Sequence, residues 1–102
     1  MTLSRKGSRI IRRDGAAYRW VVAREETALH LVVEAADRPG QRLYVEFDSD
    51  SSVLPSLVSR FIDDALVRGW RPAGRGPELR FGCADGRLIP LGPWRESRRR
   101  PP

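Results

Sequence analysis

The spacing of apolar residues changes once along this chain, and the change limits the folds that it can adopt. Between residues 9 and 47, apolar and polar side chains alternate in runs that are separated by turn-forming residues. Alternation of this kind is typical of strands with one buried face. Between Leu54 and Leu66, apolar residues recur at helical spacing instead. The sequence therefore predicts an α+β fold, in which one amphipathic helix packs on one face of an antiparallel sheet.

The first two strands are predicted to form a hairpin. Asp14-Gly15 stands between a run at residues 9–13 and a run at residues 17–23 that is rich in aromatic and β-branched residues. An Asp-Gly pair in this setting is a strong signal for a two-residue turn. Such a turn places Arg9 opposite Trp20 in the neighbouring strand.

Two further strands are expected, over residues 28–35 and 42–47, with Pro39-Gly40 in the loop between them. The best match of apolar residues across neighbouring strands places Trp20 opposite Leu31. For the next pair of strands it places Val33 opposite Val45, with a loop of five residues. The sheet is then a four-strand antiparallel meander.

The helix is expected to run from Pro55 to Arg68, because proline is favourable in a first turn and the apolar stripe continues through this range. Gly69 is expected to end the helix as a left-handed cap, which lets Trp70 fold back on the last turn. Pro72 prevents the helix from continuing.

A weaker hairpin is predicted near the C-terminus, with strands over residues 79–83 and 87–91 joined at Asp85-Gly86. The length of 102 residues leaves room for one domain. Its expected range is residues 9–91. Residues 1–8 are predicted to be a basic disordered arm, and residues 92–102 a disordered tail rich in Pro and Arg.

Several of these segments resemble a group of short uncharacterised bacterial proteins that share a domain of unknown function. The similarity covers roughly residues 7–73. Its main motifs are Tyr18-Arg19-Trp20 in a strand and Gly69-Trp70-Arg71-Pro72 at the end of the helix. Both motifs are structural in type, so the resemblance implies no activity, no cofactor and no catalytic residue.

The formal net charge of +6 is concentrated at the two ends of the chain: residues 1–13 carry +5, residues 14–94 carry −2 and residues 95–102 carry +3. Basic, flexible ends attract polyanions in a strongly salt-dependent way. The expected contacts with a polyanion are Arg5, Lys6, Arg98, Arg99 and Arg100. The alternative is that these ends reflect composition bias, because arginine outnumbers lysine throughout the chain in the manner of a GC-rich bacterial genome.

Catalytic and metal chemistry find little support in the sequence. The chain has one Cys and one His, whereas a structural zinc site needs four ligands. A nucleophilic dyad would need Cys83 beside His30. Asp63 and Asp64 are adjacent on the predicted helix, so their side chains diverge and they are expected on a solvated face. We therefore expect no metal, no cofactor and no enzymatic activity.

The single cysteine and the shortness of the apolar runs favour a soluble cytoplasmic protein that does not enter a membrane. Neither feature requires an oxidising compartment or a lipid environment.

The remaining candidate is the sheet face that points away from the helix. Strand parity assigns to this face Ile10, Arg12, Arg19, Val21, His30, Val32, Arg42 and Tyr44, together with Glu34 and Glu46. Single-stranded RNA binds such faces through aromatic rings beside basic residues. Here only Tyr44 is aromatic, and the two glutamates oppose the arginines. An apolar strip rimmed by charges of both signs is instead typical of a protein interface, and a simple solvated face is the third possibility.

The sequence thus favours a small, non-enzymatic bacterial interaction or accessory domain, which binds a protein partner or a second copy of itself through this face. The alternative is a nucleic-acid-binding accessory protein that uses its basic N- and C-terminal arms. A small enzyme is a third hypothesis, and it would need a pocket that joins His30 and Cys83.

Overall fold

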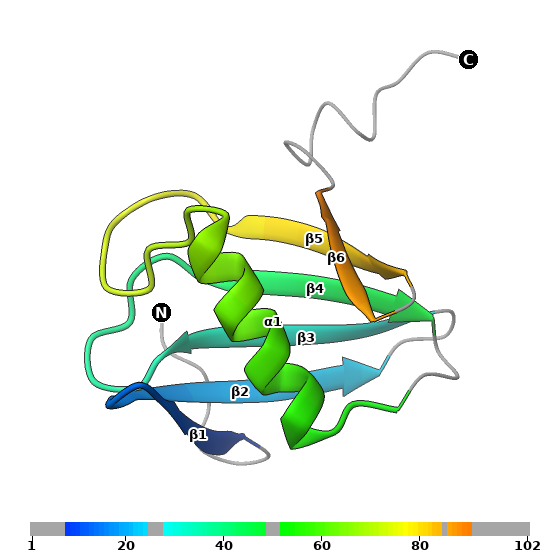
Figure 1. Ribbon diagram of the computed structural model, residues 1–102, viewed down its shortest axis with the longest axis horizontal. Helices are drawn as coiled ribbons and strands as arrows, with labels where there is room; N and C mark the ends of the chain where they lie inside the picture. Colours follow the sequence, from blue (N-terminus) through cyan, green and yellow to red (C-terminus); the bar gives the residue numbers. More distant parts are fainter. Residues whose placement is uncertain (1–7, 25–27, 49–51, 85, 91–102) are drawn as a thin grey trace.

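The strands of the described residues form one sheet whose order follows the chain, β1-β2-β3-β4-β5-β6. The computed structural model describes residues 8–24, 28–48, 52–84 and 86–90. The elements are β1 (Arg9–Arg13), β2 (Ala16–Arg24), β3 (Ala28–Ala35), β4 (Leu43–Asp48), α1 (Pro55–Val67), β5 (Leu79–Ala84) and β6 (Arg87–Pro90). Figure 1 shows α1 lying across one face of the sheet. The α+β class and the four-strand meander at the start of the sheet are confirmed.

The C-terminal hairpin is present, but it extends the sheet instead of standing apart from it. β5 pairs with β4 in parallel, with Leu79 opposite Leu43, and β6 then pairs with β5 antiparallel. Parallel neighbours need a crossover connection, and α1 supplies it. The 13 residues of α1 return the chain by about 20 Å at the usual helical rise. The helix therefore brings the start of β5 beside the start of β4.

The register of β1 and β2 is confirmed, with Arg9 opposite Trp20, whereas the predicted register of β2 and β3 is wrong by two residues. Trp20 lies opposite Val33 instead of Leu31, and β2 continues through Arg24, one residue further than predicted. A displacement of two leaves each side chain on the same face. Alternation alone therefore does not separate the two registers.

The predicted register of β3 and β4 is also displaced by two residues, for a different reason. Val33 lies opposite Leu43 instead of Val45. The connection between the two strands is therefore longer than predicted. Its additional length allows Gln41 to reach the chain that follows α1.

Gln41 joins this connection to the segment after α1 through its backbone and its side chain. Its backbone N–H donates to the Gly74 carbonyl at 2.9 Å, and its carbonyl accepts from Trp70 Nε1 at 2.9 Å. Its side-chain Oε1 accepts from the Arg71 N–H at 2.9 Å, and its Nε2 donates to the Pro77 carbonyl at 2.9 Å. These bonds fix the exit of the helix relative to the sheet.

The predicted cap of α1 is confirmed. Gly69 adopts φ of 105°, its N–H donates to the Leu66 carbonyl at 3.2 Å, and the Trp70 N–H donates to the Ala65 carbonyl at 2.9 Å. This pair of hydrogen bonds is the Schellman arrangement, which requires a left-handed residue after the helix. The cap turns Trp70 back onto the core, where its side chain is 2% exposed.

The core lies between α1 and the inward face of the sheet. The helix contributes Val58, Phe61, Ile62 and Ala65. The sheet contributes Tyr18, Trp20, Leu29, Leu31, Val33, Leu43, Val45, Phe47, Phe81 and Leu88. The rings of Tyr18 and Trp20 therefore serve core packing, as their parity predicts.

The two edge strands of the sheet, β1 and β6, also contact α1, so the helix is held at both edges of the sheet (Figure 1). From β1, the Arg13 guanidinium donates to both carboxylate oxygens of Asp63, and this hydrogen bond and charge raise the pKa of Arg13. On the other side, Arg68 Nη2 donates to the Leu88 carbonyl of β6 at 3.3 Å. Asp63 was expected on a solvated face, and its half-buried pairing with β1 corrects that expectation.

Tyr18 gives the fold a dependence on alkaline pH. Its ring lies against Trp70, with centroids 5.6 Å apart. Burial, and to a smaller extent the charges of Asp14 and Asp63, raise the pKa of its hydroxyl above the ordinary 10.0. The folded protein thus holds this proton more tightly than the unfolded chain. The resulting stability is complete below about pH 10 and is lost as the pH rises through the pKa of the folded state.

We expect Tyr18→Phe to flatten the decline in stability above about pH 10, because the replaced ring has no hydroxyl to ionise. Thermal unfolding followed by circular dichroism across alkaline pH provides the measurement. An equally steep decline in the native protein and the variant would exclude Tyr18 as the source.

Candidate interaction face

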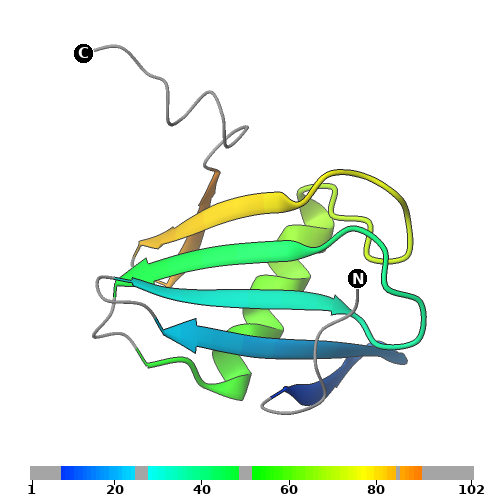
Figure 2. The same cartoon turned by 180° about the vertical axis from the view of Figure 1, so that it is seen from behind.

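Figure 2 shows the outer face of the sheet, which is turned away from α1. The strand registers arrange the side chains of this face in rows across the strands. The central row consists of Val21, Val32, Tyr44 and Arg80, which are direct neighbours on β2 to β5. The Glu46 row consists of Ala23, His30, Glu46 and Gly82. The Arg19 row consists of Ile10, Arg19 and Glu34, with Arg42 paired to Glu34 at its end. Arg12 lies beyond the Arg19 row, opposite Ala17. The structure therefore brings the sequence-predicted residues together on one face.

The central row is an apolar and aromatic patch with a fixed arrangement. Val21, Val32 and Tyr44 are all half-buried, and Ile10 in the neighbouring Arg19 row is 47% exposed. The Arg80 guanidinium lies 4.1 Å from the centroid of the Tyr44 ring, and the His30 ring lies 5.0 Å from it. Cation–π and ring contacts of this kind hold Tyr44 in place.

Glu34 is buried, in contrast to the expectation that it stands on the outer face as an exposed charge. The Glu34 side chain is 1% exposed, and its Oε1 accepts from Arg42 Nε at 3.3 Å. A buried carboxylate needs such a partner. Arg42 thus forms an ion pair with Glu34, and Arg19 Nη1 donates a hydrogen bond to Ser8 Oγ at 3.4 Å. Burial of Glu34 therefore leaves the partly exposed guanidinium groups of Arg19 and Arg42 as the charged surface of this row.

The hypothetical Cys83–His30 dyad does not form. His30 belongs to the outer face, beside Glu46, whereas Cys83 lies opposite Leu88 and packs against the core on the other side of the sheet. Two clefts in the described part of the chain are lined by both Phe47 and Cys83, and His30 lines neither of them. In the described ranges, no group of three or more His, Cys, Asp or Glu side chains is placed to hold a metal ion.

The predicted polyanion contacts Arg5, Lys6, Arg98, Arg99 and Arg100 lie outside the described residues. The arm at residues 1–8 and the tail at residues 92–102 lie outside them as well, except for Ser8. No helix in the part of the chain that the structure describes combines the length and the apolar character needed to cross a bilayer.

The sequence does not predict two features of the structure that bear on function: the position of Arg80 and a cleft beside Arg9 and Trp20. Arg80 joins the outer face only because β5 lies parallel to β4, although its alternation with Leu79 and Phe81 already places it on the opposite side from them. A cleft also opens on the helix side of the sheet, beside Arg9 and Trp20. Its signal was the predicted pairing of these two residues across the first hairpin.

Comparisons of the chain with protein-family models, with curated proteins and with solved structures find no match.

Proposed function

We propose that the protein is a non-enzymatic interaction module, which associates with a second copy of itself through the outer face. The observation that carries the proposal is the central row, because it sets Val21, Val32 and Tyr44 side by side on three neighbouring strands. Ile10 adds an exposed apolar side chain in the neighbouring Arg19 row, at the edge of the sheet. A continuous apolar strip with charges at its rim is the usual composition of a protein interface.

The distribution of charge favours a second copy as the partner. A two-fold interface must be complementary to itself. The Arg19 row and the Glu46 row flank the central row on opposite sides, with an excess of positive charge in the first and of negative charge in the second. Two outer faces can stack face to face about a two-fold axis that lies between the sheets and runs parallel to the rows. This axis reverses the direction along the strands, so the Arg19 row of each copy faces the Glu46 row of the other. The central rows then meet each other.

Nucleic-acid binding by the same face is less well supported. The ring of Tyr44, the aromatic residue named for base stacking, is already contacted by Arg80 and His30. A base would have to displace one of these contacts to stack on it. Binding of nucleic acid by the terminal arms stays a separate prediction, which a salt-dependent titration with the native chain would test.

A charge exchange between the two rows tests self-association. Arg19→Glu makes one row acidic, and Glu46→Arg makes the other row basic, so each variant alone places like charges opposite each other. We expect each variant to be monomeric where the native protein associates, and an equimolar mixture of the two to associate again. Light scattering coupled to size-exclusion chromatography, from micromolar to millimolar protein, gives the masses. Arg60→Glu, an exposed change on α1, is the matched control and should leave the association unchanged.

A second variant addresses the apolar strip. Val21→Thr combined with Val32→Thr keeps both side chains β-branched, so the strands are preserved. We expect it to weaken association by about tenfold or more, which corresponds to about 1.4 kcal/mol. A native protein that remains monomeric at every concentration would overturn the proposal, as would a mixture of the charge variants that does not associate.

A further inference from the structure

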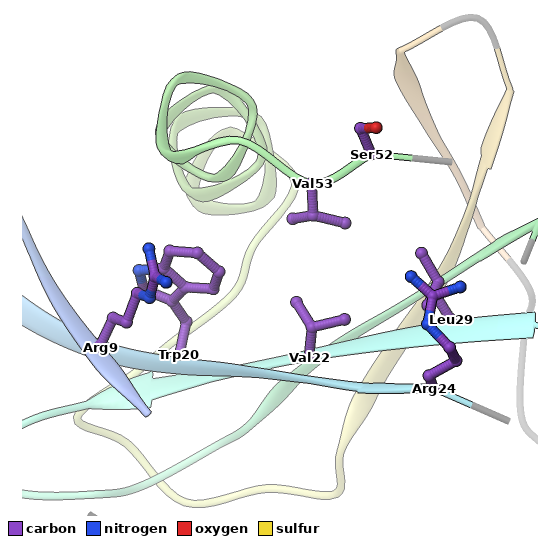
Figure 3. A pocket seen from close by; sticks show the side chains of 7 residues that line it. All are labelled: Arg9, Trp20, Val22, Arg24, Leu29, Ser52 and Val53. Carbon is purple, nitrogen blue, oxygen red and sulfur yellow. The ribbon is translucent and has the colours of Figure 1, made fainter. Parts of the chain in front are cut away.

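A cleft of about 430 Å³ opens on the side of the sheet that carries α1, between β2 and the segment that leads into the helix (Figure 3). Its apolar lining consists of Trp20, Val22, Leu29 and Val53. Its polar lining consists of Arg9, Arg24 and Ser52. The volume lies within the range of small-molecule sites, and apolar walls with a few polar groups are their usual lining.

Arg9 and Trp20 together form a pair of hydrogen-bond donors at one end of this cleft. The Arg9 guanidinium lies 5.8 Å from the centroid of the Trp20 ring, and Figure 3 shows the two side chains next to each other. Arg9 is exposed, and no carboxylate among the described residues forms an ion pair with it. The Arg9 guanidinium is therefore a cation held at the mouth of the cleft by an aromatic ring.

The indole N–H of Trp20 is the second donor. Within the described ranges it has no acceptor, in contrast to the indole N–H of Trp70, which donates to Gln41. The described side chains include no buried nitrogen or oxygen atom that lacks a hydrogen-bond partner. The indole nitrogen of Trp20 is therefore accessible to solvent, although the side chain as a whole is only 5% exposed. Trp20 lines the cleft, so a molecule in the cleft can meet this donor.

Beyond these donors the cleft becomes apolar. Figure 3 shows Val22 on β2 and Val53 on the segment before α1 pointing toward each other, with Leu29 further along the same side. A ligand that satisfies both ends needs oxygen acceptors at one end and an apolar body at the other. A carboxylate suits the first requirement, because guanidinium groups bind carboxylates with two parallel hydrogen bonds.

We propose that this cleft binds a small organic acid, whose carboxylate accepts from Arg9 and from the Trp20 indole N–H. Its aliphatic or aromatic body lies against Val22, Leu29 and Val53. Arg24 and Ser52 border the far end of the cleft and are not needed for this assignment. The site is on the opposite side of the sheet from the outer face, so it is independent of the proposed self-association.

Benzoate is the probe for the test, and benzyl alcohol is its uncharged counterpart. The native chain is labelled with ¹⁵N, and the indole N–H signal of Trp20, assigned by its loss in Trp20→Phe, is followed during titration. We expect a saturable shift of this signal with benzoate and at least a tenfold weaker response to benzyl alcohol. Arg9→Gln should weaken benzoate binding at least fivefold. Arg87→Gln, an exposed change on β6, is the matched control and should bind benzoate as the native protein does.

Three results would overturn the proposal. The first is a Trp20 signal that does not move with benzoate, and the second is an equal response to benzyl alcohol, which would exclude the carboxylate. The third is equal weakening by Arg9→Gln and Arg87→Gln, since binding would then follow the overall charge of the protein and not this cleft. Arg9 is exposed on an edge strand, so its replacement leaves the core intact and keeps the comparison valid.

Discussion

Trp70→Ala is expected to lower the free energy of unfolding by about 4 kcal/mol, the usual cost of deleting a buried tryptophan side chain. The side chain is 2% exposed and packs on Tyr18, and its N–H donates to the Gln41 carbonyl at 2.9 Å. The substitution therefore opens a cavity and also removes one of the bonds that hold the helix exit. Since small domains are stable by only about 5–15 kcal/mol, the variant should be close to unfolding at ambient temperature. Urea unfolding followed by far-ultraviolet circular dichroism measures the effect.

Two variants separate the contributions of Trp70. Trp70→Phe keeps an aromatic ring in the core but loses the N–H donor, and it is expected to cost about 1–3 kcal/mol. Val67→Ala at the same end of the helix is the matched control. Val67 is 87% exposed, so its replacement should change stability by less than about 0.5 kcal/mol. A cost of Trp70→Ala no larger than that of Val67→Ala would show that Trp70 does not anchor the helix.

Gly40→Ala is expected to cost about 3 kcal/mol, at the upper end of the usual penalty for overpacking. A Cβ atom at this position would lie 2.2 Å from the Gly74 carbonyl oxygen and 2.6 Å from that of Pro72. Both neighbours are backbone atoms, so no side-chain rotation relieves the clash. The two loops have to separate, and the hydrogen bond from the Gln41 N–H to Gly74 is lost with the contact.

Gly74→Ala in the facing loop provides the control for this prediction. A Cβ atom there would lie 3.2 Å from both the Cβ and the Nε atom of Arg71, a milder crowding than at Gly40 that a shift of a few tenths of an ångström would relieve. Its expected cost is less than about 1 kcal/mol. Amide hydrogen exchange at Gln41 and Arg71 locates the damage, because both amide groups should exchange faster in Gly40→Ala. Protection of these amides equal to that in the native protein would contradict the proposed contact between the loops.

The sequence predicts the faces of the strands more securely than their registers. Alternation assigns Val21, Val32 and Tyr44 to the outer face, and any displacement by two residues keeps them there. The turn at Asp14-Gly15 is short and specific, so the register that it sets is the one found. The next two loops have no such constraint. Their lengths depend on where β2 ends and on what Gln41 contacts far along the chain.

For the candidate sites too, the sequence predicts the face on which a residue lies but not the residues that it contacts. Residues on the outer face follow from parity, but Glu34 becomes buried and paired with Arg42, which periodicity does not reveal. The contact of Arg80 with Tyr44 requires β5 beside β4, and that neighbour is determined by the crossover through α1. The cleft at Arg9 and Trp20 needs a third wall from Ser52 and Val53, which the start of the helix supplies.

By itself, the sequence determines the local structure of this protein: alternating strands, one capped helix, and the side of each strand that faces the core. These properties depend on interactions between residues that are close in the chain, such as the turn at Asp14-Gly15 and the cap at Gly69. Only the tertiary structure decides the place of β5 and β6 in the sheet, the meeting of the loops at Gly40 and Gln41, and the residues that surround each surface. These features depend on contacts between residues that are distant in the chain. The pattern of neighbouring residues does not predict the free energies of such contacts.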